Sequence, residues 1–295
     1  MATLYTQQSR NVTKTWLLMS AFFVIVIGIG FFFSQYYGNP NILYFFVIFS
    51  IGMNVMSYWY SDKIALKLNH AKQIKKEENP ELWNIVENLS ITAGLPMPKL
   101  YVINDPSPNA FATGRNKEHA VVAVTTGLLQ ILDRNELEGV IAHELSHIGN
   151  RDILLSTVVV VLVGFISIVA DMFLRSMFWG GGRSRDNDRG GGIMMLVGIL
   201  LSILAPIFAI LIQLAISRKR EFLADASGAL LTRYPEGLAN ALVKISKYPK
   251  PMTYANKATA HLFIANPFGG MGKKVSGLFN THPPMEARVK ALLGK

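Results

Sequence analysis

The stretch WLLMSAFFVIVIGIGFFFSQYY, Trp16–Tyr37, carries no charged residue over 22 positions. A helix of about 20 apolar residues crosses the hydrocarbon core of a bilayer. A second run of that kind, ILYFFVIFSIGMNVMSYWY at Ile42–Tyr60, follows the turn at 38–40, and aromatic residues gather at the ends of both runs. The first run is too long for a signal peptide and no small-residue cleavage site follows it. Together the two runs predict a hairpin of transmembrane helices.

Two further uncharged runs, Ile153–Ala170 and Ile193–Ile216, lie in the middle of the chain. They are long enough to predict a second membrane hairpin, and the alternative is a pair of helices buried in a water-soluble core. Residues 175–192 between them hold two Gly-Gly-Gly triplets among arginines. This composition predicts a flexible loop.

Composition and charge narrow the function classes. Of the 295 residues, 51% are hydrophobic and only 16% are charged, against about 25% charged in average soluble domains. The absence of cysteine excludes disulfides, thiolate metal ligands and a cysteine nucleophile. The net charge of +10 is spread along both polar parts without an aromatic-interleaved basic patch, which favours a membrane-facing protein over one that binds nucleic acid. Basic residues at 218–220 place that end of the fourth run in the cytoplasm.

The expected organisation is a mostly α-helical integral membrane protein with four apolar segments. Its polar domain is assembled from two separated halves, and Leu100–Ile103 and Ala120–Thr125 predict strands of a small sheet within it. The expected units are an amino-terminal hairpin at 1–62, a first polar half at 63–152, a second hairpin at 153–216 and a second polar half at 217–295.

The motif His143-Glu144-Leu145-Ser146-His147 predicts a metal site on a helix. Asp133, with Glu136 three residues later, predicts a capping box at the start of that helix. His143 and His147 are one turn apart on the same face, so both imidazoles can bind one ion. Glu144 is angularly displaced, so its carboxylate can reach a metal-bound water and take its proton.

A catalytic zinc needs a third protein ligand. A third histidine six residues after His147 is excluded, because that position is Ile153, and cysteine is absent. A carboxylate remains, and Glu221 and Asp225 are also one helical turn apart, so one can bind the metal while the other supports a ligand histidine. The alternative for Glu221 is a surface charge beside the membrane.

The motifs 143–147 and 221–225 resemble, in this order, those of the M48 family of membrane zinc metallopeptidases. The segments Asn109-Ala110-Phe111-Ala112-Thr113-Gly114 and Thr281-His282-Pro283-Pro284, with the apolar runs, resemble its HtpX branch of bacterial stress-linked proteases. The resemblance implies a zincin-like protease domain with one Zn²⁺ per chain, in a protein of the bacterial plasma membrane. It also implies that the protein cleaves damaged or misfolded membrane proteins. The charge pattern places both polar halves and the amino terminus on the cytoplasmic side.

The resemblance also implies roles for individual residues. Glu221 becomes the third zinc ligand and Asp225 supports His143. The residues that it implies for binding of substrate or oxyanion are Asn109, His282 and Arg288. Without the resemblance, the expectation is an ordinary turn residue at position 109 and a loop histidine at position 282.

The sequence supports three further expectations. Ala120–Thr125 is expected as the edge strand that pairs with an extended substrate. His70, His119 and His261 are expected at the surface or at helix ends. Two rival functions are a peptidase of prenylated carboxyl-terminal peptides, which typically has more membrane segments, and an inactive scaffold or chaperone, for which an intact metal motif has no use.

Overall fold

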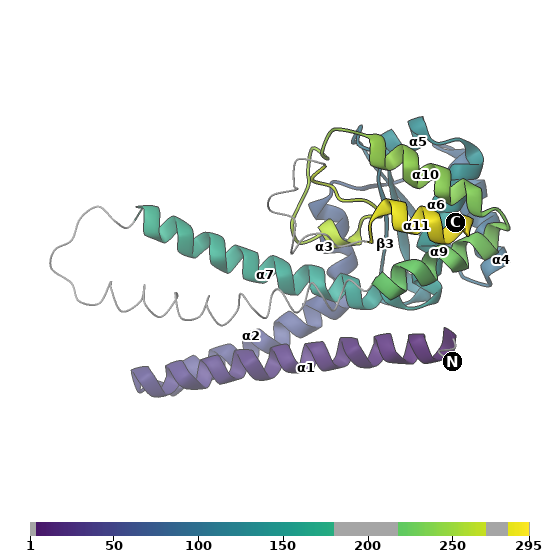
Figure 1. Ribbon diagram of the computed structural model, residues 1–295. Helices are drawn as coiled ribbons and strands as arrows, with labels where there is room; N and C mark the ends of the chain where they lie inside the picture. Colours follow the sequence, from purple (N-terminus) through teal and green to yellow (C-terminus); the bar gives the residue numbers. More distant parts are fainter. Residues whose placement is uncertain (1–3, 180–217, 270–282, 295) are drawn as a thin grey trace.

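The two amino-terminal apolar runs form an antiparallel helical hairpin (Figure 1). The computed structural model describes residues 4–179, 218–269 and 283–294. Helix α1 (Leu4–Tyr37) turns at Gly38, whose φ is 63°, and α2 (Pro40–Trp59) begins at a proline after Asn39 caps it. The predicted helical hairpin is confirmed, and both helices are long and apolar enough to cross a membrane.

Helix α1 begins well before its apolar run. Its first residues lie beside the polar domain rather than at the far end of the hairpin (Figure 1). The contact is specific, because Asn11 of α1 donates a hydrogen bond to Asp152, at the start of the third apolar run. The amino-terminal helix therefore joins the membrane hairpin to the domain.

The third run is helix α7 (Asp152–Trp179), which follows α6 (Arg134–Gly149) after a bend of 85°. Arg151 at the bend has a φ of 57°. The two helices count as a third candidate span if the bent pair is taken as one. From Ile153 to Val163 most side chains of α7 are buried against α1, α2, α3 (Ser61–Leu68) and the sheet.

The boundaries of the predicted loop at 175–192 are partly wrong. Helix α7 continues to Trp179, because residues 175–179 contain no glycine or proline and the first glycine triplet begins at residue 180. The rest of that loop and the fourth apolar run, 193–216, lie outside the described residues.

A four-stranded mixed sheet forms one layer of the polar domain. Its order is β1-β2-β4-β3, with β2 and β4 parallel and the two outer pairs antiparallel. The strands are β1 (Lys72–Gln73), β2 (Lys99–Ile103), β3 (Ala110–Thr113) and β4 (Val121–Thr125). Strands at the two predicted positions are confirmed, but the expectation that the second is the edge strand is wrong. Strand β4 lies inside the sheet and β3 lies at its edge, because the chain folds β3 back along β4.

Helices pack around α6, which is buried along most of its length (Figure 1). Apolar side chains of α4, α6, α10 and the sheet form one continuous core beneath the histidine motif. The remaining elements are α4 (Pro80–Ala93), a 3₁₀ turn η1 (Lys117–His119), α5 (Thr126–Ile131), α9 (Arg218–Thr232), α10 (Pro235–Lys247), a 3₁₀ turn η2 (Ala260–Leu262) and α11 (Met285–Leu293). Because these helices and the sheet pack against α6, the backbone of the histidine motif is held in place.

Candidate metal centre

Helix α6 presents the histidine motif as its sequence predicts. The capping box is present: the Glu136 N–H donates to Asp133 at 3.0 Å and the Asp133 N–H donates to Glu136 at 2.9 Å. The imidazoles of His143 and His147 lie on one face, with their Nε2 atoms 3.2 Å apart. Glu144 is buried beside them.

Helix α9 brings Glu221 to the two histidines from the other polar half of the chain. The helices approach closely at Gly228, where a Cβ would lie 3.0 Å from the backbone nitrogen of His143. A larger residue at 228 would push α9 away, so the glycine sets the distance at which Glu221 reaches the motif. The predicted helical placement of Glu221 and Asp225 is confirmed, since both lie on α9.

The three groups are spaced as ligands of one ion. A Glu221 carboxylate oxygen lies 3.6 Å from His147 Nε2, and the other lies 3.9 Å from His143 Nε2. Suitable atoms of all three residues lie within 4.8 Å of one another. A tetrahedral zinc with bonds of about 2.0–2.1 Å separates its ligand atoms by about 3.3 Å. The donor set of two imidazoles and one carboxylate therefore fits zinc in both chemistry and spacing.

A small cavity lies at this cluster. Its volume is about 30 Å³, and it is lined by residues of α6, α7, α9, β3 and the segment at 261–264. Within it, the Glu144 carboxylate accepts a hydrogen bond from the Ala112 N–H of the edge strand. Burial raises the pKa of Glu144 to about 7. Such a group can hold or release a proton near neutral pH.

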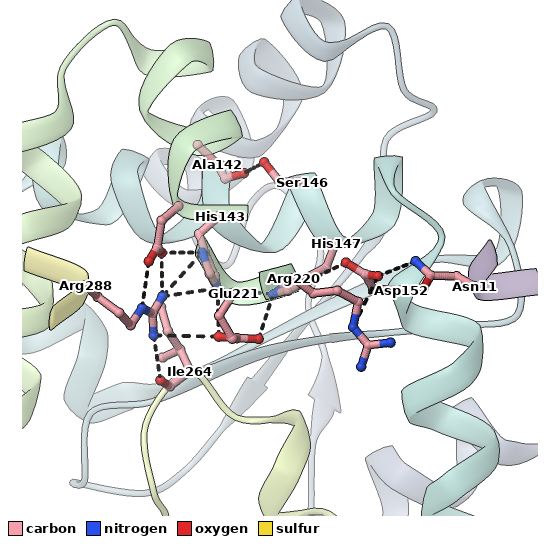
Figure 2. A network of polar contacts seen from close by, with 11 residues as sticks. Asn11, Ala142, His143, Ser146, His147, Asp152, Arg220, Glu221, Ile264 and Arg288 are labelled. Atoms are coloured by element: carbon pink, nitrogen blue, oxygen red, sulfur yellow. Dashed lines mark hydrogen bonds and ion pairs between the residues drawn. The ribbon is translucent and has the colours of Figure 1, made fainter. Parts of the chain in front are cut away.

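His143 is supported by a buried ion pair within the polar domain (Figure 2). Its Nδ1 lies 3.0 Å from Asp225 Oδ1. Arg288, with no exposed surface, donates to both oxygens of Asp225 at 2.6 and 2.8 Å. Burial alone would raise the pKa of Asp225, but the hydrogen bonds from Arg288 and His143 outweigh it and lower that pKa to about 2. Burial also lowers the pKa of His143 to about 4.

His147 has a separate support that sequence reasoning missed. Its Nδ1 lies 3.0 Å from Asp152 Oδ2 at the start of α7, and the other oxygen of Asp152 faces Asn11 and Arg220 (Figure 2). Burial would lower the pKa of His147, but the hydrogen bond to Asp152 and the charge of Glu221 raise it to about 9. Asp152 follows the motif by five residues, and nothing in the sequence separates it from an ordinary helix-capping residue.

Of the remaining predicted site residues, Asn109 and Arg288 lie near the cavity but do not line it. Asn109 is 1% exposed, and its side chain donates to the Ala265 carbonyl at 3.0 Å and accepts from the Ala265 N–H at 3.2 Å, so it fastens that segment. Arg288 faces Asp225, and His282 lies outside the described residues. Contact of these three residues with substrate or oxyanion stays a prediction.

The position expected for His261 is wrong. His261 was expected at the surface or at a helix end, but in η2 it is 7% exposed and lies at the cavity wall. Its Nε2 lies 2.9 Å from the Ser156 carbonyl of α7. The expectation is wrong because η2 packs on α7, a contact between residues 105 positions apart.

Comparison with known proteins agrees with this geometry. Residues 76–295 match peptidase family M48. The chain is 52% identical to a "Protease HtpX homolog" of Caldanaerobacter subterraneus subsp. tengcongensis, over 98% of this chain and 97% of the relative. It is 50% identical to a protein of the same description from Thermococcus kodakarensis, over 95% of this chain and 94% of the relative.

The fold also resembles a solved structure, the crystal structure of S. mikatae Ste24p. The TM-score is 0.50 at 19% sequence identity, and the likeness covers 99% of this chain and 67% of the other. At this identity the likeness concerns the fold alone.

The match over most of the chain, the identity to the HtpX homologs and the His-His-Glu cluster lead to one conclusion: the chain belongs to peptidase family M48, as a membrane metallopeptidase of the HtpX type.

Proposed function

We propose that this protein is a zinc endopeptidase that cleaves damaged or misfolded membrane proteins. The observation that carries the proposal is the spacing of His143, His147 and Glu221, with the Glu144 carboxylate in the same buried cavity. These three residues are the proposed ligands of one zinc ion, and Glu144 is the proposed catalytic base. Two imidazoles and one carboxylate are a donor set that leaves a fourth position open.

The chemistry of the chain itself centres on Glu144. When bound, zinc would polarise the scissile carbonyl and acidify the attacking water. Glu144 accepts the proton of that water and returns it to the leaving amine. Its pKa, raised to about 7 by burial, suits both directions of transfer near neutral pH. Asp225 and Asp152 hold the two imidazoles in the orientation that directs their Nε2 atoms to the cavity.

The edge strand β3 offers a place for an extended substrate. Ala112 of β3 lies at the cavity wall, and a peptide added as a further strand would pass Glu144. Two backbone groups of this edge already have partners. The Ala112 N–H donates to Glu144, and the Ala110 carbonyl accepts from the Ile264 N–H at 2.9 Å, in the segment at 261–264. Substrate pairing along β3 therefore requires this segment to shift. His282 is proposed to contact the oxyanion, while Arg288 supports His143 through Asp225.

The position of the site favours membrane-protein substrates. Helix α7 begins at Asp152, five residues after His147, so the apolar run starts at the metal centre. We place both polar halves on one side of the membrane, because His147 precedes the run at 153–216 and Glu221 follows it, yet both must reach one ion. The run therefore crosses the membrane twice or not at all. We place that side in the cytoplasm of a bacterial cell, because the basic residues at 218–220 directly follow the run.

Cysteine labelling tests this placement, since the chain has no native cysteine. In intact cells, Lys117→Cys and Lys250→Cys should be protected from a membrane-impermeant thiol reagent, and Ser184→Cys should be labelled. Labelling of only one polar half would separate the proposed ligands and contradict the assignment.

The function itself is tested on detergent-purified wild type beside Glu144→Gln, with an unfolded membrane protein as substrate. The variant should keep its zinc, because the three ligands remain, and should lose more than about a hundredfold in turnover, because the base is gone. Undiminished turnover by Glu144→Gln would contradict the mechanism. Zinc-loaded wild type that cleaves nothing would favour a scaffold, and activity confined to prenylated carboxyl-terminal peptides would favour the rival peptidase.

A further inference from the structure

Asn11, in the amino-terminal helix α1, contacts the support of the metal centre. It is 2% exposed, and its side-chain nitrogen lies 2.5 Å from Asp152 Oδ1 and 3.2 Å from the Asn150 carbonyl. Both acceptors belong to the sharp bend between α6 and α7, where Arg151 has a φ of 57°. The contact joins residues 141 positions apart (Figure 2).

The two oxygens of Asp152 have different partners. Oδ2 lies 3.0 Å from His147 Nδ1, while Oδ1 takes the hydrogen bond from Asn11 and lies 3.6 Å from Arg220 Nε. A carboxylate bound on one side alone can rotate about its Cβ–Cγ bond. Donors on its other oxygen restrict that rotation, and with it the orientation of the imidazole that it binds. Outer hydrogen bonds of this kind tune metal ligands.

A purely structural role for Asn11 is a weaker account of its surroundings. A buried amide costs free energy unless its hydrogen bonds are made, and an apolar residue would pack α1 without that requirement. The buried neighbour Thr15, one turn further along α1, shows the contrast: its hydroxyl donates to the Asn11 carbonyl of its own helix, at 2.9 Å. Asn11 instead directs its amide to the Asp152 carboxylate.

We propose that Asn11 is a positioning residue of the zinc site, which fixes the orientation of His147 through Asp152. The amino-terminal membrane helix then forms part of the support of the metal centre. The inference rests on the proposed function, because it takes His147 as a zinc ligand. It adds a residue of α1, outside the protease domain, to the set that determines metal affinity.

A double-mutant cycle tests this coupling in the full-length protein in detergent. The variants are Asn11→Ala, Asp152→Ala and the double variant, with Thr15→Ala as a control for the loss of a buried polar group from the same helix. The readout is the zinc dissociation constant, measured by competition with a chromophoric chelator. Asp152→Ala should weaken binding by about 10–100-fold, and Asn11→Ala, one contact further out, by about 3–10-fold.

The cycle separates positioning from packing. If Asn11 acts through Asp152, Asn11→Ala should have no further effect on zinc affinity in the Asp152→Ala background, and Thr15→Ala should leave it within about twofold of wild type. The same loss from Asn11→Ala in both backgrounds, or an equal loss from Thr15→Ala, would overturn the proposal.

A folding measurement and a second variant show whether a loss of zinc affinity arises from misfolding. Thermal unfolding of the metal-free proteins shows whether each variant is folded, and Asn11→Leu, which is close to asparagine in shape but has no donor, is read by the same criterion if Asn11→Ala does not fold. Normal zinc affinity in both Asn11 variants would overturn this inference alone. Failure of the wild type to bind zinc would overturn the assignment of the metal ligands, and this inference with it.

Discussion

The two histidines of one helix differ in where their support comes from. Asp225 of α9 contacts His143, and Arg288 of α11 donates two hydrogen bonds to Asp225. The whole support of His143 therefore lies within the protease domain. His147 is held by Asp152, at the first residue of the apolar helix α7. One ligand is therefore anchored in the domain and the other at its junction with the membrane helices.

The difference also appears in the proton affinity of the two rings. Burial dominates at His143 and lowers its pKa to about 4, whereas carboxylates around His147 outweigh burial and raise its pKa to about 9. At His143 burial outweighs the hydrogen bond to Asp225, and the nearby positive charge of Arg288 lowers the pKa in the same direction as burial. In the metal-free protein, the surroundings of His143 therefore favour a neutral ring, whereas the carboxylates around His147 favour a protonated ring.

The largest expected effect is a loss of stability when the Arg288–Asp225 pair that supports His143 is broken. Arg288→Leu leaves the buried Asp225 carboxylate without its bidentate partner, and breaking a buried pair costs about 3–5 kcal/mol. Removing both charges in Arg288→Leu/Asp225→Leu should recover part of that loss. Denaturant unfolding of the metal-free protein, followed by tryptophan fluorescence, measures both variants. An unchanged midpoint in Arg288→Leu would show that the pair does not hold the domain together.

Zinc affinity compares the two supports directly. Asp225→Ala and Asp152→Ala should each weaken zinc binding by about 10–100-fold, because each removes the carboxylate that orients one ring. Glu138→Ala is the matched control, since that carboxylate lies on α6 but pairs with the exposed Arg134. If Asp152→Ala bound zinc as tightly as Glu138→Ala, the second support would have no role at the metal.

The slope of zinc affinity against pH sharpens the comparison further. In the metal-free protein His147 is protonated below about pH 9, so zinc must displace its proton, while His143 is already neutral. Zinc affinity should therefore rise by about tenfold per unit between about pH 7 and 9, and level off above. Asp152→Ala lowers the pKa of His147 and should flatten this rise. Chelator competition across that range measures it, and an equal slope in both proteins would contradict the role of Asp152.

Local patterns made much of the fold and site predictable. The capping box at Asp133 and Glu136 and the helical spacing of the histidine motif depend only on neighbours three or four residues away. The first two membrane helices follow from length and apolarity alone. The pairing of Glu221 with Asp225 on one helix was predictable for the same reason, although their distance from the motif was not.

Contacts between residues far apart in the sequence could not be predicted. Asn11 and Asp152 meet across 141 positions, and neither stands in a pattern that indicates the other. The order of the sheet was missed because strand β3 is a short apolar segment whose pairing with β4 depends on the path of the chain. His261 joined the cavity for a similar reason, since the packing of η2 on α7 leaves no local signal.

The zinc content of the purified protein tests the central claim most directly, namely that both polar halves supply ligands to one ion. Wild type should carry one zinc per chain, and Glu221→Ala almost none, because one of three protein ligands is lost. Glu236→Ala and Glu286→Ala, which remove exposed carboxylates of the same polar half, should keep the wild-type content. Full zinc occupancy in Glu221→Ala, or its loss in one of these two controls, would contradict the assigned site.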